Sequence, residues 1–266
     1  MTTVTESLRR PARQLPVFYL AMAGIFAVIA FAGFTRSYLL PVVMNRFDGP
    51  ALIHLHAMLL FGWMALFVWQ SGLVRYGRVE AHRAWGMVGI SLATGAVFTT
   101  IALIVRGLDA AQAAGNYDRL RLPVIAVLSQ IVLFAAFVAA AVASIRRPET
   151  HRRLMLLATA SLLPPAVARL FGLVLALVLA PPDAGRRSIA NVTNVNLAFA
   201  VTLAAALVVD LFIVAAIVRD WRTRGRPHAA YVVGGACMLT VQLLRKPIAY
   251  TPLWHWVTDG LLTLAS

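Results

Sequence analysis

The chain is poor in cysteine, in acidic residues and in charge as a whole. Its 266 residues include a single cysteine, Cys237, which excludes internal disulfides and thiolate metal clusters. Charged residues make up 13% of the chain and hydrophobic residues 61%, far outside the composition of soluble globular domains. One lysine accompanies 23 arginines, a bias typical of GC-rich bacterial genomes. These features predict a bacterial membrane protein.

Long apolar runs recur along the chain, and runs of about 20 residues are long enough to cross a bilayer as helices. The first run has no small-x-small site after it, which predicts an uncleaved anchor. Loops are short, so we expect an all-α fold: a polytopic membrane helical bundle of about seven transmembrane helices, with residues 1–266 forming a single domain. The seven expected spans are near residues 14–34, 51–74, 84–105, 122–145, 154–180, 195–218 and 229–244.

Basic residues in the loops predict the orientation of these helices. The amino terminus and alternate loops hold 14 cations against nine on the other side, which predicts a cytoplasmic amino terminus in a bacterial inner membrane. The cations are dispersed in threes and fours at helix ends, where anionic lipid headgroups account for them, so nucleic acid is not an expected partner. The 14 are Arg9, Arg10, Arg13, Arg75, Arg78, Arg83, Arg146, Arg147, Arg152, Arg153, Arg219, Arg222, Arg224 and Arg226.

A short polar segment is repeated before two of the expected spans. Residues 78–83, Arg-Val-Glu-Ala-His-Arg, recur 69 positions later as residues 147–152, Arg-Pro-Glu-Thr-His-Arg. A third loop ends in His228 at the equivalent place. The repeat predicts one histidine at the start of each following helix. His82 and His151 are the predicted metal or haem ligands, because neutral imidazole is a common ligand of both.

Other polar residues fall inside the expected spans, where burial is costly and usually functional. His54 and His56 begin the second span but are two positions apart, so they cannot share one helix face. The equal alternative is that one of the two is interfacial and the other is a core histidine, hydrogen-bonded to a neighbouring helix. The remaining candidates near the outer side are Gln130, Asn194, Asn196 and His255. His255 lies in a tail, residues 248–264, that is too short to span the membrane. The two tryptophans of this tail suit an interfacial anchor.

Arg169 is the cation placed deepest in the expected bundle. It follows His151 by 18 residues, which is five turns of one helical face, and Pro164-Pro165 should kink the helix between them. An intramembrane guanidinium needs an anion or water. The candidates are Asp210 in the sixth span and the carboxylate of a ligand such as a haem propionate.

Several sequence segments resemble a family of bacterial multispan predicted membrane proteins, over nearly the whole chain. The resemblance implies the fold and the choice of residues, but no reaction. One departure is that Pro227 precedes His228 here, where the family has His before Pro. The matching segments are Phe34-Thr35-Arg36-Ser37-Tyr38, His54-Leu55-His56, His82-Arg83-Ala84-Trp85-Gly86, the run from His151-Arg152-Arg153-Leu154-Met155 to Thr159, Ala168-Arg169-Leu170, and Thr251-Pro252.

Three functions are compatible with these patterns. The first is an integral inner-membrane protein with a histidine-based cofactor or metal site, most simply b-type haem electron transfer with His82, His151 and His54 or His56 as ligands. The second is a small transporter or lipid-handling protein with a midplane Arg169/Asp210 site. The third is an accessory subunit that assembles with membrane partners or with copies of itself. Phosphate-binding loops, Gly-x-Ser-x-Gly and Cys-x-x-Cys-His are absent from the sequence.

Overall fold

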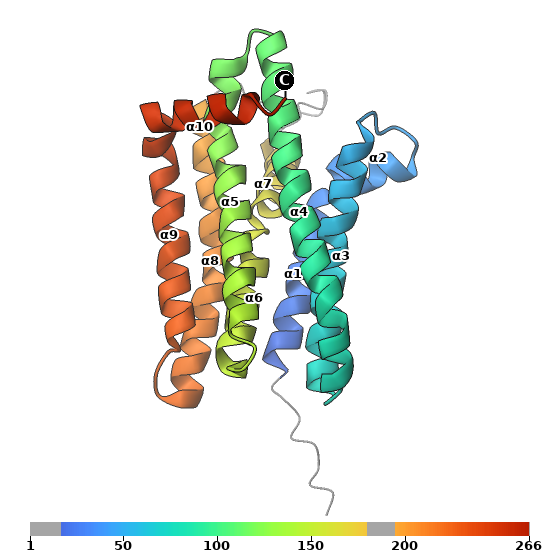
Figure 1. The fold of residues 1–266 in the computed structure, drawn as a ribbon, viewed down its shortest axis with the longest axis vertical. Helices are drawn as coiled ribbons and strands as arrows, with labels where there is room; N and C mark the ends of the chain where they lie inside the picture. The colour runs from blue at the N-terminus through green and yellow to red at the C-terminus, as the bar shows by residue number, and fades with distance from the viewer. Residues whose placement is uncertain (1–16, 180–194, 266) are drawn as a thin grey trace, which may run out of the picture.

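The computed structural model describes residues 17–179 and 195–265, and every element among them is a helix. This confirms the all-α prediction. Figure 1 shows the long helices side by side in one bundle. The elements are α1 (Phe18–Phe34), the π-helical turn η1 (Thr35–Leu39), α2 (Leu40–Val43), α3 (Ala51–Arg75), α4 (Val79–Ala113), α5 (Tyr117–Ala143), α6 (Pro148–Ser161), α7 (Pro164–Leu179), α8 (Val195–Arg224), α9 (Ala229–Ala249) and α10 (Pro252–Leu262).

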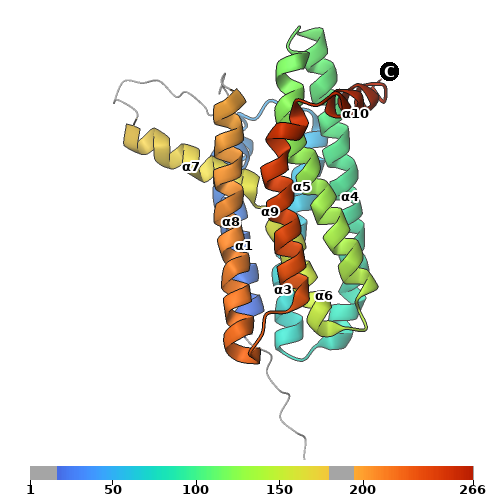
Figure 2. The ribbon, with the colours of Figure 1, turned by 90° about the vertical axis from the view of Figure 1, so that its left-hand side faces the viewer.

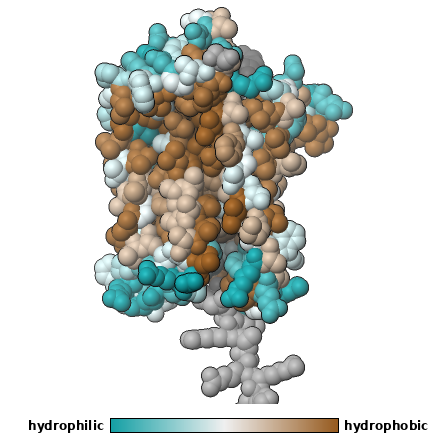
Figure 3. All heavy atoms as spheres, viewed as in Figure 1, coloured by the Kyte–Doolittle hydropathy of each residue, from teal (hydrophilic) through white to brown (hydrophobic). Residues whose placement is uncertain are grey.

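Five helical segments of the described chain are long and apolar enough to cross a membrane, and α6 with α7 makes a sixth if the bent pair is one span. The predicted seventh span corresponds to α9, whose 21 residues are not among them. Figure 3 shows a brown hydrophobic band between two teal polar ends, as a bilayer requires of a protein surface. The molecule is therefore suited to a membrane as a multi-pass protein.

The turns at residues 76–78, 144–147 and 225–228 lie together at the bottom of Figure 1, which we call the lower end. The turn at residues 114–116 and helix α10 lie at the opposite, upper end. Residues 35–43 and 106–113, which lie between the expected spans, are helical, because α1 continues through η1 into α2 and α4 runs for 35 residues. At 1.5 Å per residue α4 is roughly 50 Å long, so its polar end projects well beyond a hydrocarbon core of about 30 Å.

The predicted fifth span is broken at its prolines. Helix α6 ends at Ser161 and α7 begins at Pro164, and the two are bent by 42°. Proline lacks an N–H and fixes φ, so it begins a helix readily but interrupts one in progress. The predicted kink is confirmed. The prediction that His151 and Arg169 share one continuous helix face is wrong, because Figure 2 shows α7 leaving the bundle sideways.

Close packing at Gly33 fixes α7 against α1. A Cβ atom at this position would lie 2.5 Å from the backbone oxygen of Ala166, closer than real Cβ contacts. Only glycine lets the two backbones approach this closely. The core of the bundle is filled by fully buried side chains, among them Phe26, Phe134, Leu156 and Leu163. The glycine therefore sets where α7 starts, and with it the position of Arg169.

A buried ion cluster ties α6 to α8 at the lower end. Arg153 donates to both carboxylate oxygens of Asp220, at 2.8 and 2.7 Å, and both side chains are essentially inaccessible. It also donates to Glu149 at 2.6 Å. Arg153 was expected among the lipid-facing loop cations, and that prediction is wrong: α6 begins at Pro148, which carries Arg153 inside the bundle. The amino-terminal arginines and the loop at 181–194, with Asn194, lie outside the described residues.

The carboxyl-terminal tail forms α10, which lies across the upper end of the bundle in Figure 1. Its 11 residues are too few to span, as predicted. The hydroxyl of Thr251 accepts from the Trp254 backbone N–H, capping the helix. Trp254 is buried and donates from Nε1 to the Arg121 carbonyl at 2.9 Å, whereas Trp256 is 74% exposed. Only Trp256 is therefore free to act as the predicted interfacial anchor.

Candidate functional site

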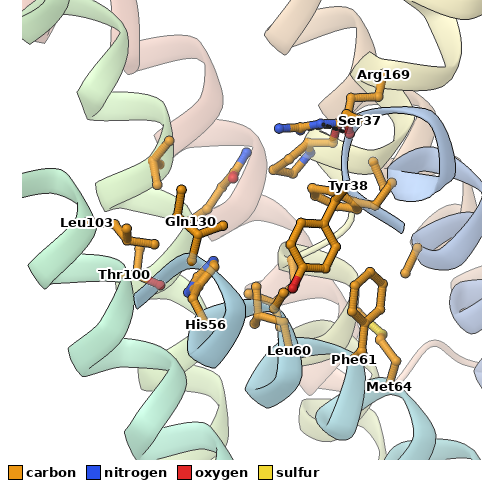
Figure 4. Close-up of a pocket in the computed structure, with 18 of the residues that line it drawn as sticks. Ser37, Tyr38, His56, Leu60, Phe61, Met64, Thr100, Leu103, Gln130 and Arg169 are labelled. Carbon is orange, nitrogen blue, oxygen red and sulfur yellow. Dashed lines mark hydrogen bonds between the residues drawn. The ribbon is translucent and has the colours of Figure 1, made fainter. Parts of the chain in front are cut away.

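A cavity of about 480 Å³ lies in the upper half of the bundle, between α1, η1, α3, α4, α5 and α7. Its wall is mainly apolar, built from side chains such as Leu60, Phe61 and Met64. A few polar groups converge on it: Ser37, Tyr38, His56, Thr100, Gln130 and Arg169. Figure 4 shows His56, Gln130 and Tyr38 around this space, with Arg169 beside Ser37 at one edge. An apolar cavity with few convergent polar groups is the usual form of a small-molecule site.

Arg169 is held at the cavity by neutral groups. Its Nε donates to the Ser37 hydroxyl at 3.2 Å and its Nη1 to the Pro165 carbonyl at 2.9 Å. The guanidinium carbon stacks 4.3 Å from the centre of the Phe34 ring. No acidic side chain among the described residues forms an ion pair with it. Part of the guanidinium stays open, because the side chain is exposed. The cation therefore keeps donors available for a ligand.

The ion pair between Arg169 and Asp210, one of the two partners expected from the sequence, is not formed. Asp210 on α8 accepts from Gln242 Nε2 on α9 at 3.2 Å. The nearby Arg245 donates to Ser129 at 2.8 Å and forms no ion pair with Asp210. Arg169 donates to Ser37 on η1, whereas Asp210 accepts from Gln242 on α9, so the two side chains have different neighbours.

His56 presents one ring nitrogen to the cavity. Its Nδ1 lies 3.2 Å from the Thr99 hydroxyl, and that hydroxyl donates its only proton to the Gly95 carbonyl at 2.8 Å. Nδ1–H is therefore the donor to Thr99, which leaves a lone pair on Nε2. Gln130, which is 7% exposed, adds a carboxamide to the same wall. Together these groups give the cavity both donors and acceptors.

His54 supports the cavity wall without lining it. Its Nδ1 lies 2.9 Å from the Tyr38 hydroxyl, and its ring packs against Phe47. His54 and His56 thus point to different neighbours, η1 and α4, as their spacing predicted. Tyr38 and Ser37 were not predicted as site residues. Their place on a π-helical turn could not be inferred from helical periodicity.

His82 and His151 converge at the lower end, far along the chain from each other. Their ring centres are 6.2 Å apart and their planes cross at 84°. They lie in the first turns of α4 and α6, as the repeated segment predicted. His228 is instead the N-cap of α9. Its burial, with Arg153 and Arg224 nearby, lowers the pKa of the imidazole.

The described residues contain no group of three or more His, Cys, Asp or Glu side chains placed to hold a metal ion. The histidines therefore fall into separate places: His56 at the cavity, His54 behind it, and His82 with His151 at the other end. The predicted polar residues Asn196 and Asp210 on α8, and His255 on α10, are not among those that line the cavity.

Comparison with known proteins adds no further constraint. Neither a protein family, nor a curated protein, nor a solved structure matches this chain. The geometry of the cavity and of the histidine pair therefore carries the functional argument alone.

Proposed function

We propose that this protein is an integral membrane protein that binds an anionic, mainly apolar small molecule in the upper cavity, as a transporter or a lipid-handling protein does. The observation that carries the proposal is Arg169, a guanidinium held against an apolar cavity by two neutral acceptors and a ring. A cation at membrane depth that has no carboxylate partner among the described residues is costly, so its presence favours a ligand that supplies the anion.

The dimensions of the cavity support the same ligand class. A volume of about 480 Å³ falls within the range of sites that enclose a drug-sized ligand. Its apolar wall suits a hydrocarbon body, and Arg169 with Ser37 suits a carboxylate or phosphate head. A fatty acid or the acidic end of a lipid has this pattern of charge and apolar surface. His56 and Gln130 then provide polar contacts farther inside.

A b-type haem belongs to the same chemical class, because it carries carboxylates on an apolar macrocycle. The Nε2 lone pair of His56 favours this second candidate, since imidazole is an axial haem ligand and Arg169 suits a propionate. A second axial imidazole is not among the lining residues of the cavity. The two candidates differ in colour, because only haem absorbs strongly in the visible range.

The placement in the membrane is part of the proposal. We propose seven spans, with α9 as the seventh, in a bacterial inner membrane. The count of loop cations supports a cytoplasmic amino terminus, with anionic lipids contacting the lower end. Reporter fusions at Gly77 and Gly225 should then report the cytoplasm, and a fusion at Gly115 the outside. The reverse pattern would place the cavity in the cytoplasmic half of the bilayer and overturn the orientation.

The ligand class can be tested with a pair of probes that differ only in charge. We expect purified protein in detergent to bind oleate more tightly than methyl oleate. Arg169→Gln should weaken oleate binding by about tenfold or more, because a charge-assisted hydrogen bond contributes about 1.5–3 kcal/mol, and should leave methyl oleate unaffected. Arg36→Gln removes a neighbouring exposed cation and serves as the matched control.

One outcome would identify the ligand as haem, and another would reject the proposed site. A Soret band in the purified protein, lost in His56→Ala and Arg169→Gln, would identify the ligand as haem. Equal binding of oleate and methyl oleate, with no change in Arg169→Gln, would reject an anion site in this cavity.

A further inference from the structure

We propose that His82 and His151 form a metal-binding site at the lower end of the bundle, distinct from the cavity and independent of its ligand. The ligand class is a first-row transition-metal ion of the Cu²⁺ or Ni²⁺ type, held between the two imidazoles. Three observations support this assignment: the distance between the rings, the fixed tautomer of His151, and buried polar atoms that lack a hydrogen-bond partner among the described residues.

The ring separation matches one shared ion. Two imidazole nitrogens at about 2 Å from an ion, on opposite sides of it, place the ring centres about 6 Å apart. The observed separation is 6.2 Å. A tetrahedral angle would bring the rings about 1 Å closer, so the geometry favours ions that accept nitrogens on opposite sides. Square-planar or tetragonal coordination by nitrogen and oxygen is typical of Cu²⁺ and Ni²⁺.

His151 has its lone pair free on the nitrogen that a metal would use. Its Nδ1 lies 2.8 Å from the Ala141 carbonyl of α5, and a carbonyl only accepts, so Nδ1–H is the donor. In the neutral ring Nε2 therefore carries the lone pair. Metal-bound histidines usually donate their other N–H to a carbonyl or carboxylate in this manner, which fixes the ring and its tautomer.

Two unpartnered polar atoms belong to His82 and to Gln70, which contacts the His82 backbone. The Nδ1 atom of His82 is buried and has no hydrogen-bond partner among the described residues. Gln70 on α3 donates from Nε2 to the His82 backbone carbonyl at 3.1 Å, and its Oε1 is likewise buried without a donor. The carbonyl contact requires the NH₂ group, so this carboxamide orientation is fixed. In the tautomer with its proton on Nε2, His82 Nδ1 is an acceptor as Gln70 Oε1 is, and a cation satisfies such buried groups.

The ligand atoms available at this site limit which metal ions can bind. Imidazole nitrogen suits Cu, Ni and Zn, whereas Mg²⁺ and Ca²⁺ take oxygen ligands. With two imidazoles, and Gln70 Oε1 as a supporting oxygen, at least one position is left to water. The chain offers a built-in control in His228, the third histidine of the loop repeat. Its Nδ1 accepts from the Ala230 backbone N–H, so that ring already caps its own helix.

Cu²⁺ is the probe that tests the site. We expect chelator-stripped protein to bind one Cu²⁺ per chain and to give an EPR spectrum with hyperfine splitting from two imidazole nitrogens. His82→Gln and His151→Gln should each weaken binding by at least tenfold and remove the two-nitrogen pattern, whereas His228→Gln should keep both. Gln70→Ala should weaken binding by about tenfold without removing the nitrogens.

Stability provides a second readout. Cu²⁺ should raise the thermal unfolding temperature of the wild type and of His228→Gln, but not of the His82 or His151 variants. A wild-type spectrum with no coupled nitrogen, or unchanged affinity in both variants, would overturn the site even if one variant fails to fold. A Soret band that both substitutions abolish would assign the pair to haem iron and overturn the bare ion. The oleate measurement is unaffected by any of these results.

Discussion

Two arginines of one broken span, Arg153 on α6 and Arg169 on α7, have opposite surroundings. Arg153 is inaccessible and donates to Asp220 and Glu149. Arg169 donates to a serine hydroxyl and a backbone carbonyl, and stacks on a phenyl ring. A guanidinium whose donors are saturated by carboxylates contributes to the fold. Arg169, whose acceptors in the described part of the chain are neutral, lies beside a cavity and retains capacity for an external anion. This difference marks Arg153 as a structural charge and is the reason for proposing that Arg169 binds a ligand.

The largest expected effect on stability comes from removing Arg153, whose donors are bound by two carboxylates. Arg153→Ala leaves the buried Asp220 without its partner and should lower the free energy of unfolding by about 3–5 kcal/mol. Adding Asp220→Ala should recover part of that loss, because the stranded charge is removed. Chemical or thermal unfolding of detergent-solubilised protein measures both. A single variant as stable as the wild type would show that the cluster is not structural.

The position of Arg169 depends on the glycine contact between α1 and α7. Gly33→Ala places a methyl group against the Ala166 backbone and should destabilise the protein by about 1–3 kcal/mol. Because α7 must shift, oleate binding should weaken as well. Gly24→Ala is the control, since a Cβ atom there meets nothing within 4 Å. Equal effects of the two substitutions would mean that the close approach does not position α7.

Replacing Arg169 should weaken ligand binding but leave the free energy of unfolding nearly unchanged. We expect Arg169→Gln to change the free energy of unfolding by less than about 1 kcal/mol, because it strands no carboxylate. In a double-mutant cycle with Asp210→Ala, measured by thermal unfolding without added ligand, the coupling energy should be near zero. A coupling of 1 kcal/mol or more would restore the ion pair that the sequence suggested and remove the reason for a ligand.

The smallest effect tests the exposed edge of the ion cluster. Glu149 contacts Arg152, Arg153 and Arg224, but its side chain is 47% exposed. Solvent screens such a carboxylate, so Glu149→Gln should cost about 1 kcal/mol or less, and the cost should shrink further in high salt. Asp220→Asn, at the buried side, is the comparison. If Glu149→Gln were the more damaging of the two, burial would not control the strength of this cluster.

The sequence predicted what depends on local pattern. Apolar runs located the long helices, Pro164-Pro165 located the break, and the repeated loop placed His82 and His151 in the first turns of their helices. The convergence of the two rings was expected only on the hypothesis that they are paired ligands, and the structure brings them together. The metal and the haem stay predictions, because a pair of rings is compatible with either.

The directions in which individual side chains point in the folded bundle could not be predicted from local sequence pattern. Loop composition put Arg153 among the lipid-facing cations, but a helix that starts five residues earlier carries it inward to Asp220. A continuous helix would have turned Arg169 toward other partners, and the angle of α7 decided between them. The cavity itself depends on η1, whose π-helical geometry brings Ser37 and Tyr38 to one wall without any signal in the hydrophobic period.

The most direct test of the central claim is photolabelling of the wild type and Arg169→Gln, in membranes, with a fatty acid that carries a diazirine on its chain. Labelled peptides are then mapped by mass spectrometry. We expect labelling concentrated on the cavity-lining segments of α3 and η1, displaced by excess oleate and lost in Arg169→Gln but kept in Arg36→Gln. Labelling spread evenly over the lipid-facing helices, and equal in all three proteins, would contradict a ligand site at Arg169.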